Sequence, residues 1–113
     1  MSDCIFCKII DGGIASTRVY EDGDVFAFRD IHPKAPVHIL IVPKKHISGV
    51  SDVTAENSAF VAKCFEAAAK IAESEKVTDG YRVITNCGAG AGQTVFHLHF
   101  HLLAGKKMGE RLV

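Results

Sequence analysis

The segment QTVFHLHFHLL, residues 93–103, alternates histidine with hydrophobic residues from position 96 onward. It contains three of the six histidines of the chain, His97, His99 and His101. A period of two is that of a β-strand, so the pattern predicts a strand over residues 95–103, with the imidazoles on one face and the hydrophobic side chains on the other. A solvent-facing strand has no need of three histidines in register. We therefore expect them to bind a metal, attack a substrate, or do both.

The composition of the 113-residue chain fits a single domain, residues 1–113, with a small partner molecule. A chain of this length buries enough surface to form a hydrophobic core. Thirteen basic residues balance thirteen acidic ones and aromatic residues make up only 8%, which argues against a nucleic-acid surface or a basic patch for membranes. Four cysteines, and no recognisable secretory signal in the first ten residues, favour a reducing compartment, and we expect the cytoplasm.

The segments before the histidine row predict further strands. In TRVYEDGDVFAFRD, residues 17–30, an Asp-Gly pair between two β-rich runs indicates a hairpin. VHILIVPK, residues 37–44, is a nearly continuous β-branched run typical of a central strand, and YRVITN, residues 81–86, predicts another strand. CIFCKIIDGG, residues 4–13, indicates a short helix or knuckle. Together with one long helix, this order predicts an α+β fold with a mostly antiparallel five-stranded sheet.

The long helix is predicted to begin at Thr54, as the N-cap with Glu56 in the first turn, and to end before Asp79. Hydrophobic side chains at helical spacing give it one apolar face: Phe60, Val61, Cys64, Phe65, Ala68, Ile71 and Ala72. Cys64 is therefore expected to be a small core residue rather than a reactive thiol. The hydrophobic side of the histidine strand would pack on this helix, so we expect the histidines to face solvent or a second subunit.

A glycine-rich loop, NCGAGAGQT at residues 86–94, immediately precedes the histidine row. Glycines allow backbone N–H groups to approach an anion closely, so this loop is a candidate phosphate cradle. It is not a Walker loop, because the Lys and Ser/Thr of that motif do not follow and no helix is predicted after it. A phosphate held beside imidazoles would form a site for phosphoryl or nucleotidyl transfer.

Four stretches together resemble the histidine triad (HIT) family, in its nucleotide-binding branch. They are HLHFHLL from His97, the longer block NCGAGAGQTVFHLHFHLLAG around it, FRDIHPKAPVHILIVPKKHI at residues 28–47, and FCKII at residues 6–10. The resemblance covers nearly the whole chain. It implies the HIT-like α+β fold, a homodimer, and hydrolysis of a nucleotide through a nucleotidyl-histidine. The C-terminal GKKMGERLV departs from many eukaryotic relatives, which carry a Trp-Pro-Pro segment that contributes to substrate choice.

The resemblance also implies roles for individual residues. His99 would be the nucleophile, and His101 would lie near the phosphate as a cation or hydrogen-bond donor. His38 matches a supporting histidine close to the first member of the row, His97, whereas His32 is expected in a surface loop. Asp30 would hold the ribose. The positions that match the family's base-enclosing groups are Phe6, Phe28 and Ile31, and those that line the phosphate are Asn86, Gly92, Gln93 and Thr94.

Four functions are weighed for such a site. The leading one is a purine nucleoside phosphoramidase, acting on adenosine or guanosine monophosphate joined to an amine. A dinucleoside polyphosphate hydrolase is the alternative within the same fold. A non-catalytic nucleotide-binding or interaction protein is a second class, which the intact triad argues against. A zinc hydrolase with His97 and His99 as joint ligands is a third, although no carboxylate is predicted close by.

Cys4 and Cys7 form a Cys-x-x-Cys pair, which supplies two thiolates from one tight turn. By resemblance to a zinc-binding subset of the family, we expect a structural zinc ion bound by Cys4, Cys7, His46 and His97. Two alternatives stay open. The pair could be a redox dithiol, although no βαβ pattern follows it, or the cysteines could be buried while His97 pairs with His38.

Overall fold

The computed structural model describes residues 3–113, so the first two residues of the expected domain lie outside it. Five strands form one antiparallel sheet in the order β1-β2-β3-β5-β4. Their bounds, with those of the two helices, are α1 Ile5–Ile10, β1 Arg18–Glu21, β2 Val25–Arg29, β3 Val37–Pro43, α2 Ser58–Ser74, β4 Tyr81–Ile84 and β5 Phe100–Ala104. Short 3₁₀ turns occupy Val50–Asp52 and Ala89–Ala91. The predicted α+β fold is confirmed.

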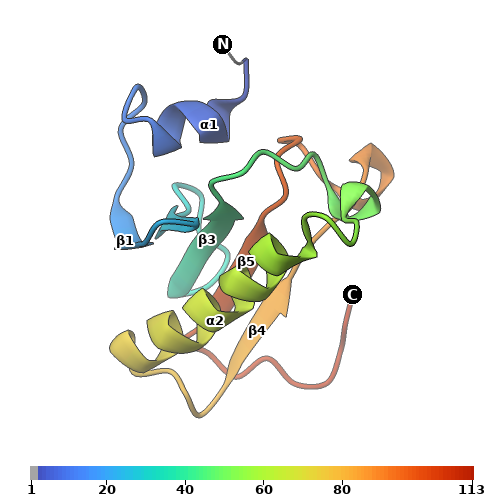
Figure 1. The fold of residues 1–113 in the computed structure, drawn as a ribbon. Helices are drawn as coiled ribbons and strands as arrows, with labels where there is room; N and C mark the ends of the chain where they lie inside the picture. Colours follow the sequence, from blue (N-terminus) through green and yellow to red (C-terminus); the bar gives the residue numbers. More distant parts are fainter. Residues whose placement is uncertain (1–2) are drawn as a thin grey trace.

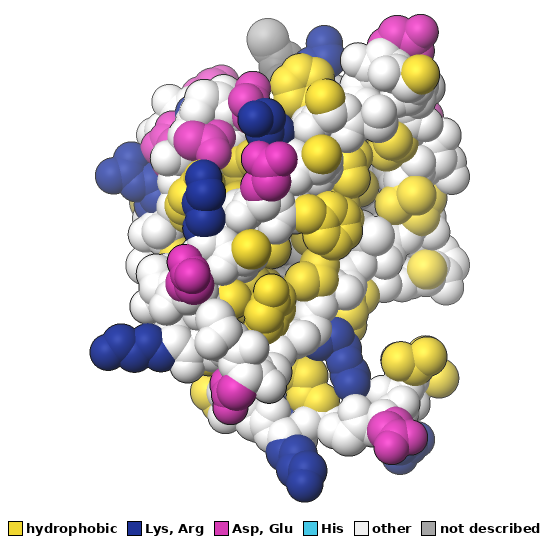
Figure 2. Space-filling model, turned by 60° about the horizontal axis from the view of Figure 1, so that its bottom comes forward, with side chains coloured by type: hydrophobic (Ala, Val, Ile, Leu, Met, Phe, Trp, Pro, Cys, Tyr) yellow, Lys and Arg dark blue, Asp and Glu magenta, His cyan; other side chains and the backbone are white. Residues whose placement is uncertain are grey.

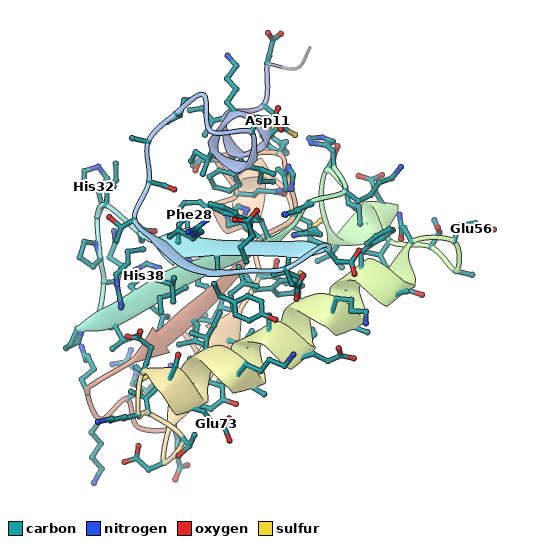
Figure 3. The ribbon with its side chains drawn as sticks, turned by 60° about the vertical axis from the view of Figure 1, so that its left-hand side comes forward. Asp11, Phe28, His32, His38, Glu56 and Glu73 are labelled. Atoms are coloured by element: carbon teal, nitrogen blue, oxygen red, sulfur yellow. The ribbon has the colours of Figure 1, made fainter. Side chains whose placement is uncertain are left out.

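The two helices cover opposite faces of the sheet, α2 one face and α1 part of the other (Figures 1 and 3). Strand alternation assigns side chains to these layers. Ile39 and Ile41 of β3 pack in the core under α2, whereas Leu40 and Val42 pack with Phe6 of α1. The side of β5 that faces α2 carries Phe100, Leu102 and Ala104, as expected. None of the helices within residues 3–113 has the length and hydrophobicity needed to cross a membrane.

Two predicted boundaries are wrong. The last strand begins at Phe100 and not at position 95, because the preceding residues leave the ladder; Leu98 donates its N–H to the carbonyl of Ile47 at 2.6 Å. Phe96, expected on the hydrophobic side, is half exposed. Helix α2 begins at Ser58 and not at Thr54, whose hydroxyl and carbonyl close a separate turn over residues 54–58.

The apolar face of α2 is largely as predicted, with one exception. Cys64 is buried in the core, and burial raises the pKa of its thiol to about 12, which leaves it inert. Phe65 is half exposed, at the border of the face, and its ring lies 5.1 Å from that of Phe100. The helix ends where Lys76 adopts a left-handed conformation with φ 62°, and the N–H of Val77 reaches back to the carbonyl of Ala72.

Candidate active site

His97 is fully buried, so the expectation that the histidine row faces solvent or a second subunit is wrong for this member. Helix α1 covers it, and the ring of Phe6 lies 6.0 Å away. Its Nε2–H donates to the carbonyl of Pro43 at 2.7 Å. Burial lowers the pKa of His97, which favours the neutral imidazole. With Nε2 protonated, the lone pair of the ring is on Nδ1.

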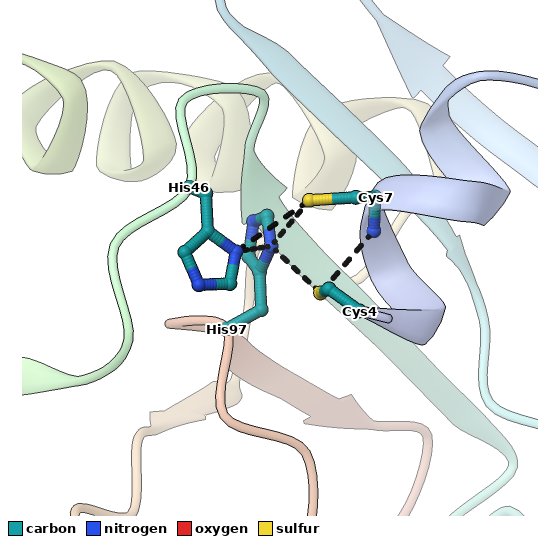
Figure 4. A group of neighbouring side chains, drawn as sticks. All are labelled: Cys4, Cys7, His46 and His97. Carbon is teal, nitrogen blue, oxygen red and sulfur yellow. Dashed lines mark hydrogen bonds between the residues drawn. The ribbon is translucent and has the colours of Figure 1, made fainter. Parts of the chain in front are cut away.

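That Nδ1 points into a group of four potential metal ligands, Cys4, Cys7, His46 and His97 (Figure 4). All four ligand atoms lie within 4.8 Å of one another. The Nδ1 of His97 is 3.4 Å from Cys4 Sγ, 3.6 Å from Cys7 Sγ and 3.1 Å from His46 Nδ1. The N–H of Cys7 donates to the Cys4 sulfur at 3.4 Å, which fixes the position of that sulfur. Three segments far apart in the sequence thus converge on a group able to hold a metal ion.

His99, the middle histidine, is also buried, with 8% of its surface exposed. Its Nδ1–H donates to the carbonyl of His97 at 2.7 Å. In a neutral imidazole this leaves the lone pair on Nε2, the nitrogen that could attack a substrate. Two further contacts hold the residue in place. The hydroxyl of Thr85 donates to the His99 carbonyl at 2.8 Å, and the ring of Phe6 meets the imidazole perpendicularly at 5.0 Å.

His38 lies beside His101 and not beside His97. The expectation that His38 lies close to His97 is therefore wrong, and so is the alternative in which His97 pairs with His38. The register explains this. His38 of β3 is directly opposite Leu103 of β5, so its neighbour on the same face is the diagonal residue His101. The two rings are joined by a 2.9 Å contact between His38 Nε2 and His101 Nδ1.

The direction of this hydrogen bond follows from the backbone. The N–H of Lys34 can only donate, and it does so to His38 Nδ1 at 3.0 Å. The proton of neutral His38 is therefore on Nε2, which donates to His101 Nδ1. His101 in turn carries its proton on Nε2, at the far side of the ring. A chain of donors thus runs from Lys34 through His38 to an outward N–H of His101.

Both histidines of this pair favour the neutral state. Burial is the main cause of the lowered pKa of His38, against the opposing charge of Asp30. The pKa of His101 falls to about 4, first because of burial and then because His99 and His38 are close. At neutral pH, His101 is therefore a hydrogen-bond donor and not a cation. Of the two states expected from the sequence, the structure favours the donor.

The expected nucleoside groups are only partly brought together. Phe6 and Phe28 are buried, with ring centroids 5.5 Å apart, and Figure 3 shows Phe28 on the side of the sheet that faces α1. Asp30 is half buried at the end of β2; one carboxylate oxygen accepts the N–H of His32, and the other is 3.4 Å from His38 Nε2. Ile31 is 85% exposed in the loop after β2, apart from the two rings. His32 is exposed in the same loop, as expected.

The residues expected to line the phosphate lie in the loop between β4 and β5. Asn86 is half buried, and Gly92 is exposed with φ 91°, a left-handed conformation that favours glycine. Thr94 is exposed and lines a cleft beside Cys4 and His46. Gln93 differs from these three because it is buried, and its side-chain amide is bonded within the protein.

Three contributors were missed from the sequence. They are the hydroxyl of Thr85, the backbone N–H of Lys34 and the carbonyl of Pro43, each of which fixes the orientation or the tautomer of a histidine. Two of the three act through backbone groups, which every residue type carries. Only the hydroxyl of Thr85, directly after β4, offered a signal.

Comparison with known proteins identifies the surrounding fold. The model of the HIT domain matches residues 11–108. A purine nucleoside phosphoramidase of Escherichia coli (strain K12) is 49% identical over 111 residues, which are 97% of this chain and 93% of the relative. The solved structure of a HIT family hydrolase from Clostridium thermocellum superposes with a TM-score of 0.97 at 49% identity, over 100% of this chain and 99% of that one. A histidine triad protein from Clostridium difficile gives 0.94 at 48%, over 98% and 97%.

Proposed function

This chain belongs to the HIT domain family, and we propose that it is a hydrolase that works through a nucleotidyl-histidine intermediate, most specifically a purine nucleoside 5′-phosphoramidase. The observation that carries the proposal is the hydrogen bond from His99 Nδ1 to the carbonyl of His97, which keeps Nε2 unprotonated for attack. The 49% identity to the Escherichia coli protein named purine nucleoside phosphoramidase supports this substrate class.

In the proposed reaction, His99 Nε2 attacks the α-phosphorus, and the bond from phosphorus to the amine breaks as the leaving nitrogen takes up a proton from solvent, which gives a nucleotidyl-histidine and the free amine. Water then attacks the same phosphorus, loses a proton to solvent, and releases the nucleoside monophosphate and the free histidine. The outward Nε2–H of neutral His101 donates to a phosphate oxygen and stabilises its developing charge. His38 contributes by holding His101 in this tautomer. The same His101 donor would serve both displacements, the attack by His99 and the attack by water.

The substrate would lie with its base against Phe6 of α1 and Phe28 of β2, which pack together. Ile31 would complete this surface from the loop, and Asp30 would accept the ribose hydroxyls. The phosphate would lie between the glycine-rich loop, with Asn86, Gly92 and Thr94, and the histidines.

We also propose that the metal is zinc, held by Cys4, Cys7, His46 and His97. Tetrahedral zinc with bonds of about 2.0–2.3 Å separates a nitrogen from a nitrogen by about 3.3 Å and from a sulfur by about 3.6 Å. The distances of 3.1 Å between the two nitrogens and 3.4–3.6 Å from nitrogen to sulfur fit this shape. Four protein ligands leave no open position, so zinc would stabilise α1 against the sheet rather than activate water.

A homodimer and a cytoplasmic location complete the proposal. Strand β4 is at the edge of the sheet, where its outer backbone groups face no neighbouring strand of the described chain. Tyr81 of β4 and Phe65 of α2 are large hydrophobic side chains that remain exposed, and Figure 2 shows hydrophobic side chains gathered in a band on one face of the molecule. A two-fold partner would cover such surfaces by self-complementary contact. Reduced thiolates at the metal site favour the cytoplasm.

Hydrolysis of adenosine 5′-phosphoramidate by the wild type and by His99→Ala tests the function. The variant is expected to lose turnover and to keep AMP binding, because the contacts to base and ribose lie elsewhere. Rapid quenching and mass spectrometry of the wild type should detect one adenylyl group on His99. His32→Ala, which removes an exposed histidine, serves as the matched control.

Three outcomes would contradict the proposal in different ways. Turnover near the wild-type rate in His99→Ala would show that His99 is not the nucleophile. A kcat/KM that is higher for a diadenosine polyphosphate than for adenosine 5′-phosphoramidate would favour the dinucleoside polyphosphate hydrolase. Activity that a chelator abolishes, without a trapped intermediate, would favour the zinc hydrolase.

A further inference from the structure

Gln93 differs from the other residues assigned to the phosphate because only 4% of its surface is exposed. Its amide nitrogen donates to the carbonyls of Ser48 at 2.8 Å and Val95 at 3.1 Å. Its amide oxygen accepts the N–H of Gly88 at 2.8 Å. A glutamine amide has two N–H donors, so both are used within the protein and neither is left for a phosphate oxygen.

Gly88 is held by Gln93 at both of its backbone polar groups. The side-chain oxygen of Gln93 binds the Gly88 N–H, and the backbone N–H of Gln93 donates to the Gly88 carbonyl at 3.1 Å. The N–H of Ala91 donates to the same carbonyl at 3.1 Å. Gly88 has φ 91°, a conformation that side chains disfavour. These bonds close the glycine-rich loop on itself, and the bond to Ser48 attaches it to the segment after β3.

We propose that Gln93 is a positioning residue, which holds the glycine-rich loop in the shape that binds the substrate phosphate and does not bind the phosphate itself. The inference rests on the proposed function, because it assigns the phosphate to the loop backbone. A loop that is already ordered does not lose conformational entropy when the ligand binds, so phosphate affinity should depend on these bonds. Phe6 of α1 and Phe28 of β2, the proposed base contacts, belong to a separate cluster, so nucleoside affinity should not depend on these bonds.

Gly49 offers a way to displace Gln93 without altering it. A Cβ atom at Gly49 would lie 3.2 Å from the Gln93 side-chain oxygen, a close approach, and 3.6 Å from both the Gln93 nitrogen and the Cys87 sulfur, which is ordinary van der Waals contact. The backbone of Gly49 is extended, with φ −173°, so alanine causes no backbone strain there. Gly49→Ala should therefore act through the Gln93 amide. Gly23, in the β1–β2 hairpin, has open space where its Cβ would be and supplies the matched control Gly23→Ala.

The test compares AMP with adenosine, which lacks the phosphate, by calorimetry on wild type, Gln93→Met, Gly49→Ala and Gly23→Ala. Methionine has nearly the shape of glutamine and no amide. We expect the AMP affinity of Gln93→Met to fall about tenfold and that of Gly49→Ala about threefold, with adenosine affinity within about twofold of wild type. Amide hydrogen exchange at Gly88 should accelerate in Gln93→Met, relative to amides in β3.

The outcomes separate the competing explanations. Reduced AMP affinity with unchanged exchange at Gly88 would mean that Gln93 contacts the phosphate directly. An equal loss for AMP and adenosine would mean general disruption, and no loss would mean that the bonds to Gln93 are dispensable; each of these three results overturns the inference. Wild-type protein that neither binds AMP nor hydrolyses the phosphoramidate would overturn the proposed function, while Gly88 exchange still reports on the bonds.

Discussion

Replacing His38 by phenylalanine should lower turnover without removing any group that touches the substrate. The substitution deletes the Nε2–H that donates to His101 Nδ1 at 2.9 Å, and phenylalanine fills most of the same buried volume. A lost hydrogen bond of this kind costs about 1–2 kcal/mol. His101 would then lose its bias toward the Nε2–H tautomer by the same amount, so kcat on adenosine 5′-phosphoramidate should fall about 5- to 30-fold. The N–H of Lys34, in an exposed loop, can turn to water instead.

His38→Gln is the matched rescue, because a glutamine amide N–H can reach the position of the lost Nε2–H. We expect it to recover most of the activity, while KM changes little in either variant. Steady-state kinetics from pH 5.5 to pH 8, with thermal unfolding as a check on folding, measures both. A His38→Phe protein with kcat within twofold of wild type, or a glutamine variant no better than phenylalanine, would refute the reasoning from tautomers.

Two other predictions concern the metal and the response to acid. Elemental analysis of protein purified without chelator should give about one zinc per chain, and Cys4→Ser should lower both the zinc content and the Tm; metal-free protein with an unchanged Tm in the variant would remove this role. The folded pKa of His101, about 4, lies below its unfolded value of 6.5, so the unfolded chain binds more protons as pH falls. This contribution to stability is fully present above pH 6.5 and lost by about pH 4. The shift corresponds to about 3 kcal/mol, and solvent screening at this partly exposed ring reduces it to about 1–2 kcal/mol. Urea unfolding at pH 7 and pH 4.5 should show a smaller difference in His101→Phe than in wild type, and equal differences would contradict the assignment.

Most of the fold was predictable because the hydrophobic period changes cleanly between elements. The Asp-Gly turn, the β-branched run of β3 and the helical spacing of α2 each agree with the structure. The two boundaries that failed have different causes. Leu98 bonds to Ile47 instead of a neighbouring strand, which is a tertiary contact without a local sequence signal. The turn at Thr54 competes with the helix start through local bonds to the Thr54 hydroxyl and carbonyl, of a kind that Thr commonly forms.

The candidate site was predictable in its residue types but not in its pairings. The convergence of Cys4, Cys7, His46 and His97 follows the expected ligand set. His38 was expected beside the first histidine from the family resemblance, and the expectation failed because its neighbour depends on the register between β3 and β5, which the sequence does not reveal. The burial of the row was missed for a similar reason, since it depends on where α1 packs.

His97 and His99 present different ring nitrogens, and the backbone carbonyls that they bond to cause the difference. Pro43 takes the Nε2–H of His97, which leaves Nδ1 for the metal group. The carbonyl of His97 takes the Nδ1–H of His99, which leaves Nε2 for attack. His97 therefore serves both centres, through its ring at the metal group and through its carbonyl at the proposed nucleophile. Phe6, between the two cysteines and in contact with the rings of both His97 and His99, provides a second link. The proposed zinc would thus stabilise the orientation of the nucleophile as well as α1, because the groups that surround the metal also fix His99.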